Sequence, residues 1–318
     1  MLDLAVVARG MAVAGALRAS LETARAAERL GYRRIWFAEH HNMSSIASAA
    51  TSVLIAHVAA NTSSIRVGSG GVMLPNHSPL TIAEQFGTLA ELHPGRIDLG
   101  LGRAPGTDQA TLRALRRDPA AAEHFPEDVL ELQGFLSGES RVPGVQATPG
   151  SGTNVPLYIL GSSLFGASLA AALGLPYAFA SHFAPRALTE AVSLYRREFR
   201  PSDQLSEPHV IAAANLVAAD SSQDAREELH AVTRSRVAMF LGRGRRFTDR
   251  ELDELVESRA GRQVAQMLTY TATGDPGEVA EYLQWFAGHA DADEVMVVPA
   301  SRAVDSRIRS LELLAGTL

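Results

Sequence analysis

The stretch Ile65–Asp108, IRVGSGGVMLPNHSPLTIAEQFGTLAELHPGRIDLGLGRAPGTD, contains two short apolar runs on either side of an amphipathic segment. The apolar runs, 65–74 and 96–104, have the length and composition of buried strands. The segment between them, 79–95, has helical periodicity and ends in Pro-Gly, which stops a helix. A strand–helix–strand unit of this size is the usual connection between two parallel strands.

The same alternation extends over the chain. We expect strands at 2–7, 33–41, 65–74, 96–104, 155–161, 176–183, 208–219 and 293–300. Nearly continuous apolar strands joined by helices indicate a parallel sheet that is buried on both faces. Eight such units predict an α/β fold, a (β/α)8 TIM barrel with insertions in the loops that follow the strands. The alternative is a doubly wound open sheet, which loses ground because no GxGxxG follows the first strand.

We expect one domain over residues 1–318, with 221–270 as a lid or insertion region. Residues 221–290 have a mostly helical and charged pattern. The alanine-rich segment 44–62 predicts a helix, and its part from 46 to 60 is a candidate surface for a homodimer.

Composition excludes several functional classes. The chain has 318 residues, a formal net charge of −6 and no cysteine. The absence of a basic excess argues against nucleic acid as a partner, and the absence of cysteine excludes disulfides, thiolate catalysis and cysteine-ligated metals. No apolar run of the roughly 18 residues that span a membrane is present. The N-terminus lacks the basic region of a signal peptide, so we expect a cytoplasmic protein.

A barrel places its active site where the strands end, at their C-terminal edge. Polar residues and glycines gather at these expected strand ends. The candidates are His40, Gly70, Gly71, His77, Arg103, Gly161, Ser162, Ser163, His182 and Asn215. The strand ends therefore predict one site to which several loops contribute.

Each candidate has a structural alternative. His40 and His41 are adjacent, so in an extended chain only one of them easily faces the barrel mouth, and the other packs or is solvated. The role of Glu39 beside them stays open between orienting a histidine and bridging to an arginine. Glycines at 68, 70 and 71 permit close approach of a ligand or form a bulge. We expect no metal, because a histidine pair supplies too few ligands and the first strand has no His-x-His.

Two further candidates point to an anion. Arg103 follows a buried strand, where a guanidinium suits a phosphate or carboxylate, or pairs with a neighbouring acid. Ser162 and Ser163 precede a predicted helix, where they cap it or, with its free amides, bind an anion. Arg103 and the serines at one barrel end favour a phosphate site.

Four stretches together resemble the bacterial-luciferase-like flavin monooxygenases, in particular the single-chain oxidoreductases of that class. They are RRIWFAEHHNM at 33–43, the stretch 65–108 quoted above, VPLYILGSS at 155–163 and ASHFAP at 180–185. The resemblance spans most of the chain and is strongest from about 30 to 110. It implies a (β/α)8 barrel that binds reduced FMN or, in a sister branch, a reduced deazaflavin.

The resemblance also implies roles for single residues. His40 matches the histidine that projects towards the flavin ring, and Gly70-Gly71 matches a cis peptide beneath it. Arg103 matches an arginine at the flavin phosphate. The loop Gly161, Ser162 and Ser163 matches the phosphate cradle, and His77, His182 and Asn215 are expected to line the substrate pocket. Gly102 stands where luciferase has a reactive cysteine, so no thiol chemistry transfers.

The implied reaction is a monooxygenation that uses FMNH2 from a separate flavin reductase. Oxygen adds to the reduced flavin, and the peroxyflavin oxygenates a small apolar substrate such as an aldehyde or ketone. His40 handles a proton, because an unperturbed imidazole pKa of about 6.5 suits transfer at neutral pH. A deazaflavin-dependent oxidoreductase and a non-catalytic flavin-binding protein are the alternatives.

Overall fold

The computed structural model describes residues 1–8, 10–104, 107–242, 245 and 247–317. The chain divides into two compact units. The first unit comprises Met1–Gly161, Phe165–Ala178 and Leu194–His209, and the second comprises Ser162–Leu164, Phe179–Ser193 and Val210–Leu318.

The first unit is built on parallel strands in chain order. The strands are β1 (Leu2–Asp3), β2 (Arg34–Phe37), β3 (Arg66–Met73), β4 (Ile97–Gly102), β5 (Leu157–Gly161) and β6 (Tyr177–Phe179, whose last residue belongs to the second unit). Neighbouring strands from β1 to β5 pair in parallel. The side chains of Ile35, Val67 and Leu99 are fully buried, as expected for strands covered on both faces.

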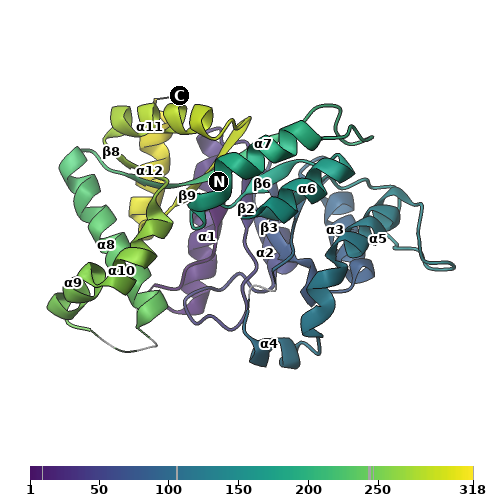
Figure 1. Ribbon diagram of the computed structural model, residues 1–318, viewed down its shortest axis with the longest axis horizontal. Helices are drawn as coiled ribbons and strands as arrows, with labels where there is room; N and C mark the ends of the chain where they lie inside the picture. Colours follow the sequence, from purple (N-terminus) through teal and green to yellow (C-terminus); the bar gives the residue numbers. More distant parts are fainter. Residues whose placement is uncertain (9, 105–106, 243–244, 246, 318) are drawn as a thin grey trace. The chain divides into compact units, whose positions relative to one another are not determined.

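Helices connect these strands, as Figure 1 shows. They are α1 (Val13–Arg29), α2 (Thr51–Ala60), α3 (Pro79–Leu92), α4 (Gln109–Ala114), α5 (Phe125–Ser137) and α6 (Leu164–Leu173), with short 3₁₀ turns η1 (Leu74–Asn76) and η2 (Pro119–His124). Helices α3 and α5 lie side by side. The connection from β4 to β5 contains both α4 and α5. It is therefore one of the insertions that were predicted in the loops after the strands.

The second unit contains β7 (Val210–Ala218), which pairs in parallel with both β8 (Thr271–Gly274) and β9 (Glu294–Pro299). Its helices are α8 (Ser222–Leu241), α9 (Asp249–Glu257), α10 (Arg259–Ala265), α11 (Pro276–His289) and α12 (Val304–Ala315), and α7 (Leu188–Glu198) belongs partly to each unit. Two further 3₁₀ turns are η3 (Pro185–Ala187) and η4 (Gln266–Leu268). Helices α8, α9 and α10 pack together and fill most of the segment predicted as an insertion, 221–270.

Three sequence-based expectations differ from the structure. The segment 221–290 is mostly helical, as expected, but it also contains β8, which was not predicted, so the strand expected as the eighth, at 293–300, is β9. The first strand stops at Asp3 rather than at residue 7, because the Asp3 carboxylate accepts the N–H groups of Leu4 and Ala5 at 2.8 and 3.1 Å. These amides are then occupied, and Ala5 takes a positive φ of 48°.

The helix expected over 44–62 begins only at Thr51. The residues before it form an irregular connection with a turn at 44–45, in which Val7 N–H donates to Ser45 O and Ala47 N–H donates to Ala5 O, at 2.8 and 3.0 Å. These bonds tie the segment to the chain that follows β1, so helical periodicity there is overridden by tertiary contacts.

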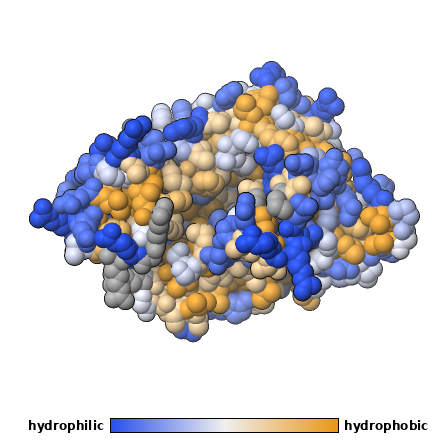
Figure 2. All heavy atoms as spheres, turned by 60° about the horizontal axis from the view of Figure 1, so that its bottom comes forward, coloured by the Kyte–Doolittle hydropathy of each residue, from blue (hydrophilic) through white to orange (hydrophobic). Residues whose placement is uncertain are grey.

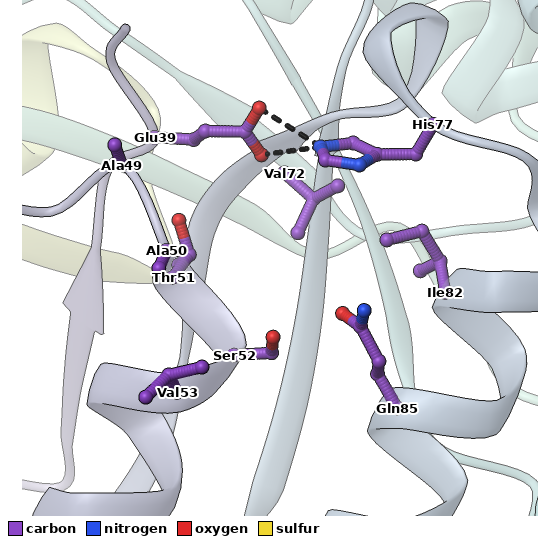
Figure 3. Close-up of a pocket in the computed structure, with 10 residues that line it drawn as sticks. All are labelled: Glu39, Ala49, Ala50, Thr51, Ser52, Val53, Val72, His77, Ile82 and Gln85. Atoms are coloured by element: carbon purple, nitrogen blue, oxygen red, sulfur yellow. Dashed lines mark hydrogen bonds and ion pairs between the residues drawn. The ribbon is translucent and has the colours of Figure 1, made fainter.

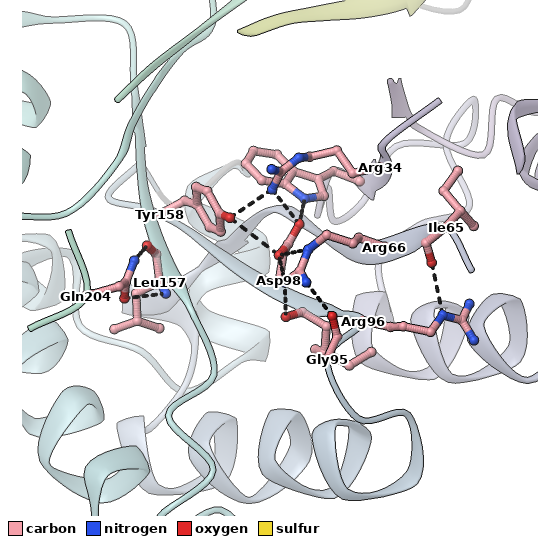
Figure 4. A network of polar contacts seen from close by, with 11 residues as sticks. Arg34, Ile65, Arg66, Gly95, Arg96, Asp98, Leu157, Tyr158 and Gln204 are labelled. Carbon is pink, nitrogen blue, oxygen red and sulfur yellow. Dashed lines mark hydrogen bonds and ion pairs between the residues drawn. The ribbon is translucent and has the colours of Figure 1, made fainter. Parts of the chain in front are cut away.

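A buried ionic network joins four adjacent strands, β2 to β5, near their beginnings (Figure 4). Asp98 in β4 is fully buried and accepts hydrogen bonds from Arg34 Nη1 at 2.7 Å, Trp36 Nε1 at 2.9 Å and Arg66 Nε at 2.9 Å. Tyr158 in β5 accepts a further bond from Arg34. Since this network lies opposite the strand ends that carry the candidate site, its role is to hold the strands together.

The surface in Figure 2 is mixed, with separate hydrophobic patches among hydrophilic residues. Exposed large apolar side chains are spread over several helices; they include Val53, Leu92, Met239 and Trp285. Among the described residues, no helix combines the length and the hydrophobicity needed to cross a bilayer.

Candidate functional site

The ends of three adjacent parallel strands carry the candidates of the first unit. His40 is half-buried and lies three residues beyond the end of β2. Gly70 and Gly71 are in β3, joined by a cis peptide bond, as the resemblance implied. Arg103 directly follows β4 and is exposed. Because β2, β3 and β4 are neighbours, these residues lie along one edge of the sheet.

The most connected side chain at this edge is that of Glu39, which is 1% exposed. Its Oε1 accepts a hydrogen bond from Nε2 of His41 at 2.8 Å. Nε2 of His77 lies 2.9 and 3.0 Å from the two carboxylate oxygens. The N–H of Met73 donates to Oε2 at 3.1 Å, and the amide of Asn76 is 3.3 Å from Oε1. We call this group the Glu39 cluster.

The contacts shift the ionisation of the cluster. Burial alone would raise the pKa of Glu39, but the hydrogen bonds from His41 and His77, the charge of His77 and the N–H of Met73 outweigh it and lower the pKa to about 2. The pKa of His41 is raised, because its hydrogen bond to Glu39 and the carboxylate charge outweigh partial burial. Glu39 is therefore an anion near neutral pH.

A cavity of about 190 Å³ borders the cluster. Figure 3 shows its walls on α2 and α3, with Glu39 and His77 joined above them. Ala50 and Val53 contribute from the start of α2, and Ile82 and Gln85 from α3. The cavity is mostly apolar, and the carboxylate–imidazole pair is its charged end.

Arg103 has an aromatic neighbour. Its guanidinium carbon lies 4.0 Å from the centre of the Phe165 ring, in the first turn of α6. Within the part of the chain that the structure describes, no carboxylate pairs with Arg103. The stacked ring covers one face of the guanidinium and leaves its N–H edge for another group, so the acid partner considered as the alternative is not found there.

The glycines of β3 are explained by packing. A Cβ at Gly70 would lie 2.8 Å from Leu2 Cδ1 and 2.9 Å from Trp36 Cβ. A Cβ at Gly71 would lie 2.8 Å from the carbonyl oxygen of Gly100. The neighbouring strands therefore leave no room for a side chain at either position, whether or not a ligand is bound. The close approach of a cofactor to these glycines stays a prediction.

The remaining candidates belong to other parts of the chain. Gly161 ends β5, and Ser162 and Ser163 lie between it and α6. In the second unit His182 is 9% exposed, and its backbone oxygen accepts a hydrogen bond from Asn215 Nδ2 at 2.8 Å.

Asn215 itself is fully buried within β7. Its Oδ1 has no hydrogen-bond partner among the described residues. A buried amide oxygen without a donor is an acceptor available to a bound polar group.

Sequence reasoning found the strand ends but not the Glu39 cluster. His77 was expected in a substrate pocket, His41 in packing or solvent, and the role of Glu39 was open between a histidine and an arginine. The structure brings the three together and shows that Glu39 binds histidines. The signal was present as the spacing of Glu39 and His41, two residues apart and so on one side of an extended chain.

Comparisons with known proteins identify the family. A family model described as luciferase-like monooxygenase matches residues 2–290. A luciferase-like monooxygenase of Escherichia coli K12 is 47% identical over 316 residues, covering 98% of this chain and 94% of that protein. The N-acetyl-S-alkylcysteine monooxygenase of Bacillus subtilis is 33% identical and covers 100% of this chain and 97% of its own.

Solved structures give the same result. The crystal structure of apo-MsnO8 superposes with a TM-score of 0.89 at 34% identity, covering 100% of this chain and 97% of that one. Two more distant structures share the fold alone. They are the oxygenating constituent of 3,6-diketocamphane monooxygenase from Pseudomonas putida with FMN (TM-score 0.71, 16% identity, 99% and 95% covered) and an F420-dependent secondary alcohol dehydrogenase (0.69, 16%, 95% and 95%).

Proposed function

The chain belongs to the luciferase-like monooxygenase family and has its α/β barrel-type fold, and we propose that it uses reduced FMN and O2 to oxygenate a small apolar organic substrate. Monooxygenase activity is the class to which the family assigns it. The identity of the cofactor, the substrate and the residues that act are the proposed part.

The cofactor proposal rests on the surroundings of Arg103, which has an aromatic neighbour but no carboxylate partner among the described residues. A cation at a strand end without a carboxylate partner among the described residues is suited to an anionic ligand. Its aromatic neighbour Phe165 lies in the first turn of α6, directly after Ser162 and Ser163. We assign the flavin phosphate to Arg103, Gly161, Ser162 and Ser163, since amides and hydroxyls at a helix start complement an anion.

The other assignments follow the strand ends. Reduced FMN, when bound, supplies the electrons that activate O2. Gly70 and Gly71 offer backbone without side chains next to the ring. His40 takes or gives a proton through its imidazole, and the buried Oδ1 of Asn215 is available to accept a hydrogen bond from a bound group. His77 and His182 border the substrate.

An aldehyde or ketone is the first substrate class to examine, and a thioether is the second. A thioether is included because the relative from B. subtilis is named as an N-acetyl-S-alkylcysteine monooxygenase. A separate flavin reductase would deliver reduced FMN. We also propose a homodimer through α2, where Val53 is 69% exposed, and a lid formed within residues 221–270.

Anaerobic titrations with reduced FMN, reduced riboflavin and reduced deazaflavin test the cofactor assignment. We expect the wild-type protein to bind FMN more tightly than riboflavin, which lacks the phosphate. Arg103→Ala should remove about tenfold or more of that preference, because a charge-assisted contact contributes about 1.5–3 kcal/mol. Glu28→Gln, in the last turn of α1 where the carboxylate contacts the loop at 63–65, is the control. Binding of deazaflavin without FMN would contradict the proposal.

A further inference from the structure

The Glu39 carboxylate has its acceptor positions filled by the chain. A carboxylate offers about four lone-pair positions, and four groups donate to Glu39. Two are imidazoles (His41 and His77), one is the backbone N–H of Met73 and one is the amide of Asn76. The charge is thus solvated by protein, although the side chain is buried.

A metal site is the other arrangement that these residue types suggest. The ligand atoms of Glu39, His41 and His77 all lie within 4.8 Å of one another. However, each histidine nitrogen points at a carboxylate oxygen from hydrogen-bond distance, and the backbone and Asn76 donors occupy the positions that remain. The cluster is complete as a hydrogen-bonded group, so we assign it a positioning role and no ion.

Glu39 is hydrogen-bonded to the backbone of β3 on both sides of Val72. The backbone N–H of Glu39 donates to Gly71 O at 3.3 Å, and its carboxylate accepts the N–H of Met73 at 3.1 Å. The pairing of β3 with β4 shifts register between Ser69 and Val72. Glu39 therefore fixes β3 at the place where regular strand pairing is interrupted.

The cluster also fixes the chain around His40. Residues two apart lie on one side of an extended chain, so the bonded pair Glu39 and His41 leaves the opposite side to His40. Beyond His41, the amide of Asn42 donates to Asp108 at 2.7 Å, which ties the loop to the segment before α4. His40 stands between two anchored neighbours.

We propose that Glu39 is a positioning residue for the oxygenation: through His41 and His77 it sets His40 against the Gly70-Gly71 segment. This proposal rests on the function proposed above, in which His40 acts beside the flavin. Glu39 acts through its neighbours and does not itself touch the cofactor.

Glu39→Gln tests the proposal, because it keeps the shape and removes the charge. Steady-state product formation is measured with FMNH2, O2 and decanal, or with an N-acetyl-S-alkylcysteine if decanal is not turned over. We expect kcat to fall about tenfold to a hundredfold, the usual effect of a small misplacement, with reduced-FMN affinity within about twofold of wild type. Proton–nitrogen NMR of the histidines should show loss of the two Nε2–H signals. Glu28→Gln, whose carboxylate accepts three backbone N–H groups and the hydroxyl of Ser64 but no histidine, should match wild type.

A second pair of variants covers the case in which Glu39→Gln does not fold. His41→Gln keeps an N–H donor near the position of Nε2 and should retain most of kcat, whereas His41→Leu should lose it. Equal loss in both, unchanged kcat in Glu39→Gln, or parallel loss of FMN affinity would overturn the positioning role. Stoichiometric zinc or iron in the purified protein would do the same.

The wild-type protein separates the two proposals. Failure to bind reduced FMN would contradict the proposed function, whatever the variants do. With FMN binding and turnover established, the variants test Glu39 alone.

Discussion

Both oxygens of the buried Glu39 carboxylate lie within 3.0 Å of Nε2 of His77, which comes from the turn after the neighbouring strand. The pair joins the end of β2 to the end of β3. The link should depend on pH, because protonation of Glu39 removes the charge that its donors stabilise, and deprotonation of His41 removes a positive charge beside it.

The contribution of Glu39 to stability should be largest between about pH 4.5 and 6.5. The lowered pKa of Glu39 means that its contribution is present above the unfolded value and is lost as pH falls towards 2. The raised pKa of His41 means that its contribution is present below its unfolded value and is lost as pH rises through the raised pKa.

Urea unfolding of wild type and Glu39→Gln measures this directly. We expect a difference of about 3 kcal/mol near pH 6 and a smaller one at pH 3 and pH 9. Glu28→Gln is the matched control: the pKa of Glu28 is also lowered, but its hydrogen-bond donors do not titrate, so its difference should not change between pH 6 and 9. A Glu39 difference that is flat across the whole range would contradict the coupling.

Asp98→Asn should destabilise the protein by about 3–5 kcal/mol, because it leaves buried Arg34 and partly buried Arg66 without their counter-charge. Chemical unfolding at neutral pH checks this. Asp220→Asn removes a carboxylate from an exposed pair with Arg309 and should have little measurable effect. Equal effects of the two substitutions would show that the Asp98 network is not a structural anchor.

Gly71→Ala should destabilise the protein in the absence of any cofactor, by about 1–3 kcal/mol, because the new methyl group meets the Gly100 carbonyl. Thermal unfolding without added flavin gives the measurement. Gly288→Ala, in α11 with no atom within 4 Å of the added carbon, should be neutral or slightly stabilising. Unchanged stability of Gly71→Ala, with only flavin affinity lost, would mean that the cofactor alone requires this glycine.

The sequence predicted most of the strands because their apolar runs are continuous and their helices strongly periodic. It missed β8, whose sequence TATG is short and has only one apolar residue. Its strand character comes from pairing with β7, a contact between segments far apart in the chain.

In the candidate site, too, local features could be predicted from the sequence and contacts between distant residues could not. Strand ends are local features, so His40, Gly70 and Arg103 were located from the pattern. The partners of a side chain are not local: Met73, Asn76 and His77 reach Glu39 from more than 30 residues away. Their hydrogen bonds decided between the two roles left open for Glu39, and no periodicity contains that information.

In the function proposed above, the protein transfers an oxygen atom from O2 to an organic substrate with reduced FMN. Mass spectrometry of the product formed under ¹⁸O2 in unlabelled water tests it most directly, with an aldehyde, a ketone and an N-acetyl-S-alkylcysteine as substrates. We expect one ¹⁸O atom per product molecule, dependent on FMNH2. Turnover that proceeds without O2 and with a reduced deazaflavin instead would contradict it.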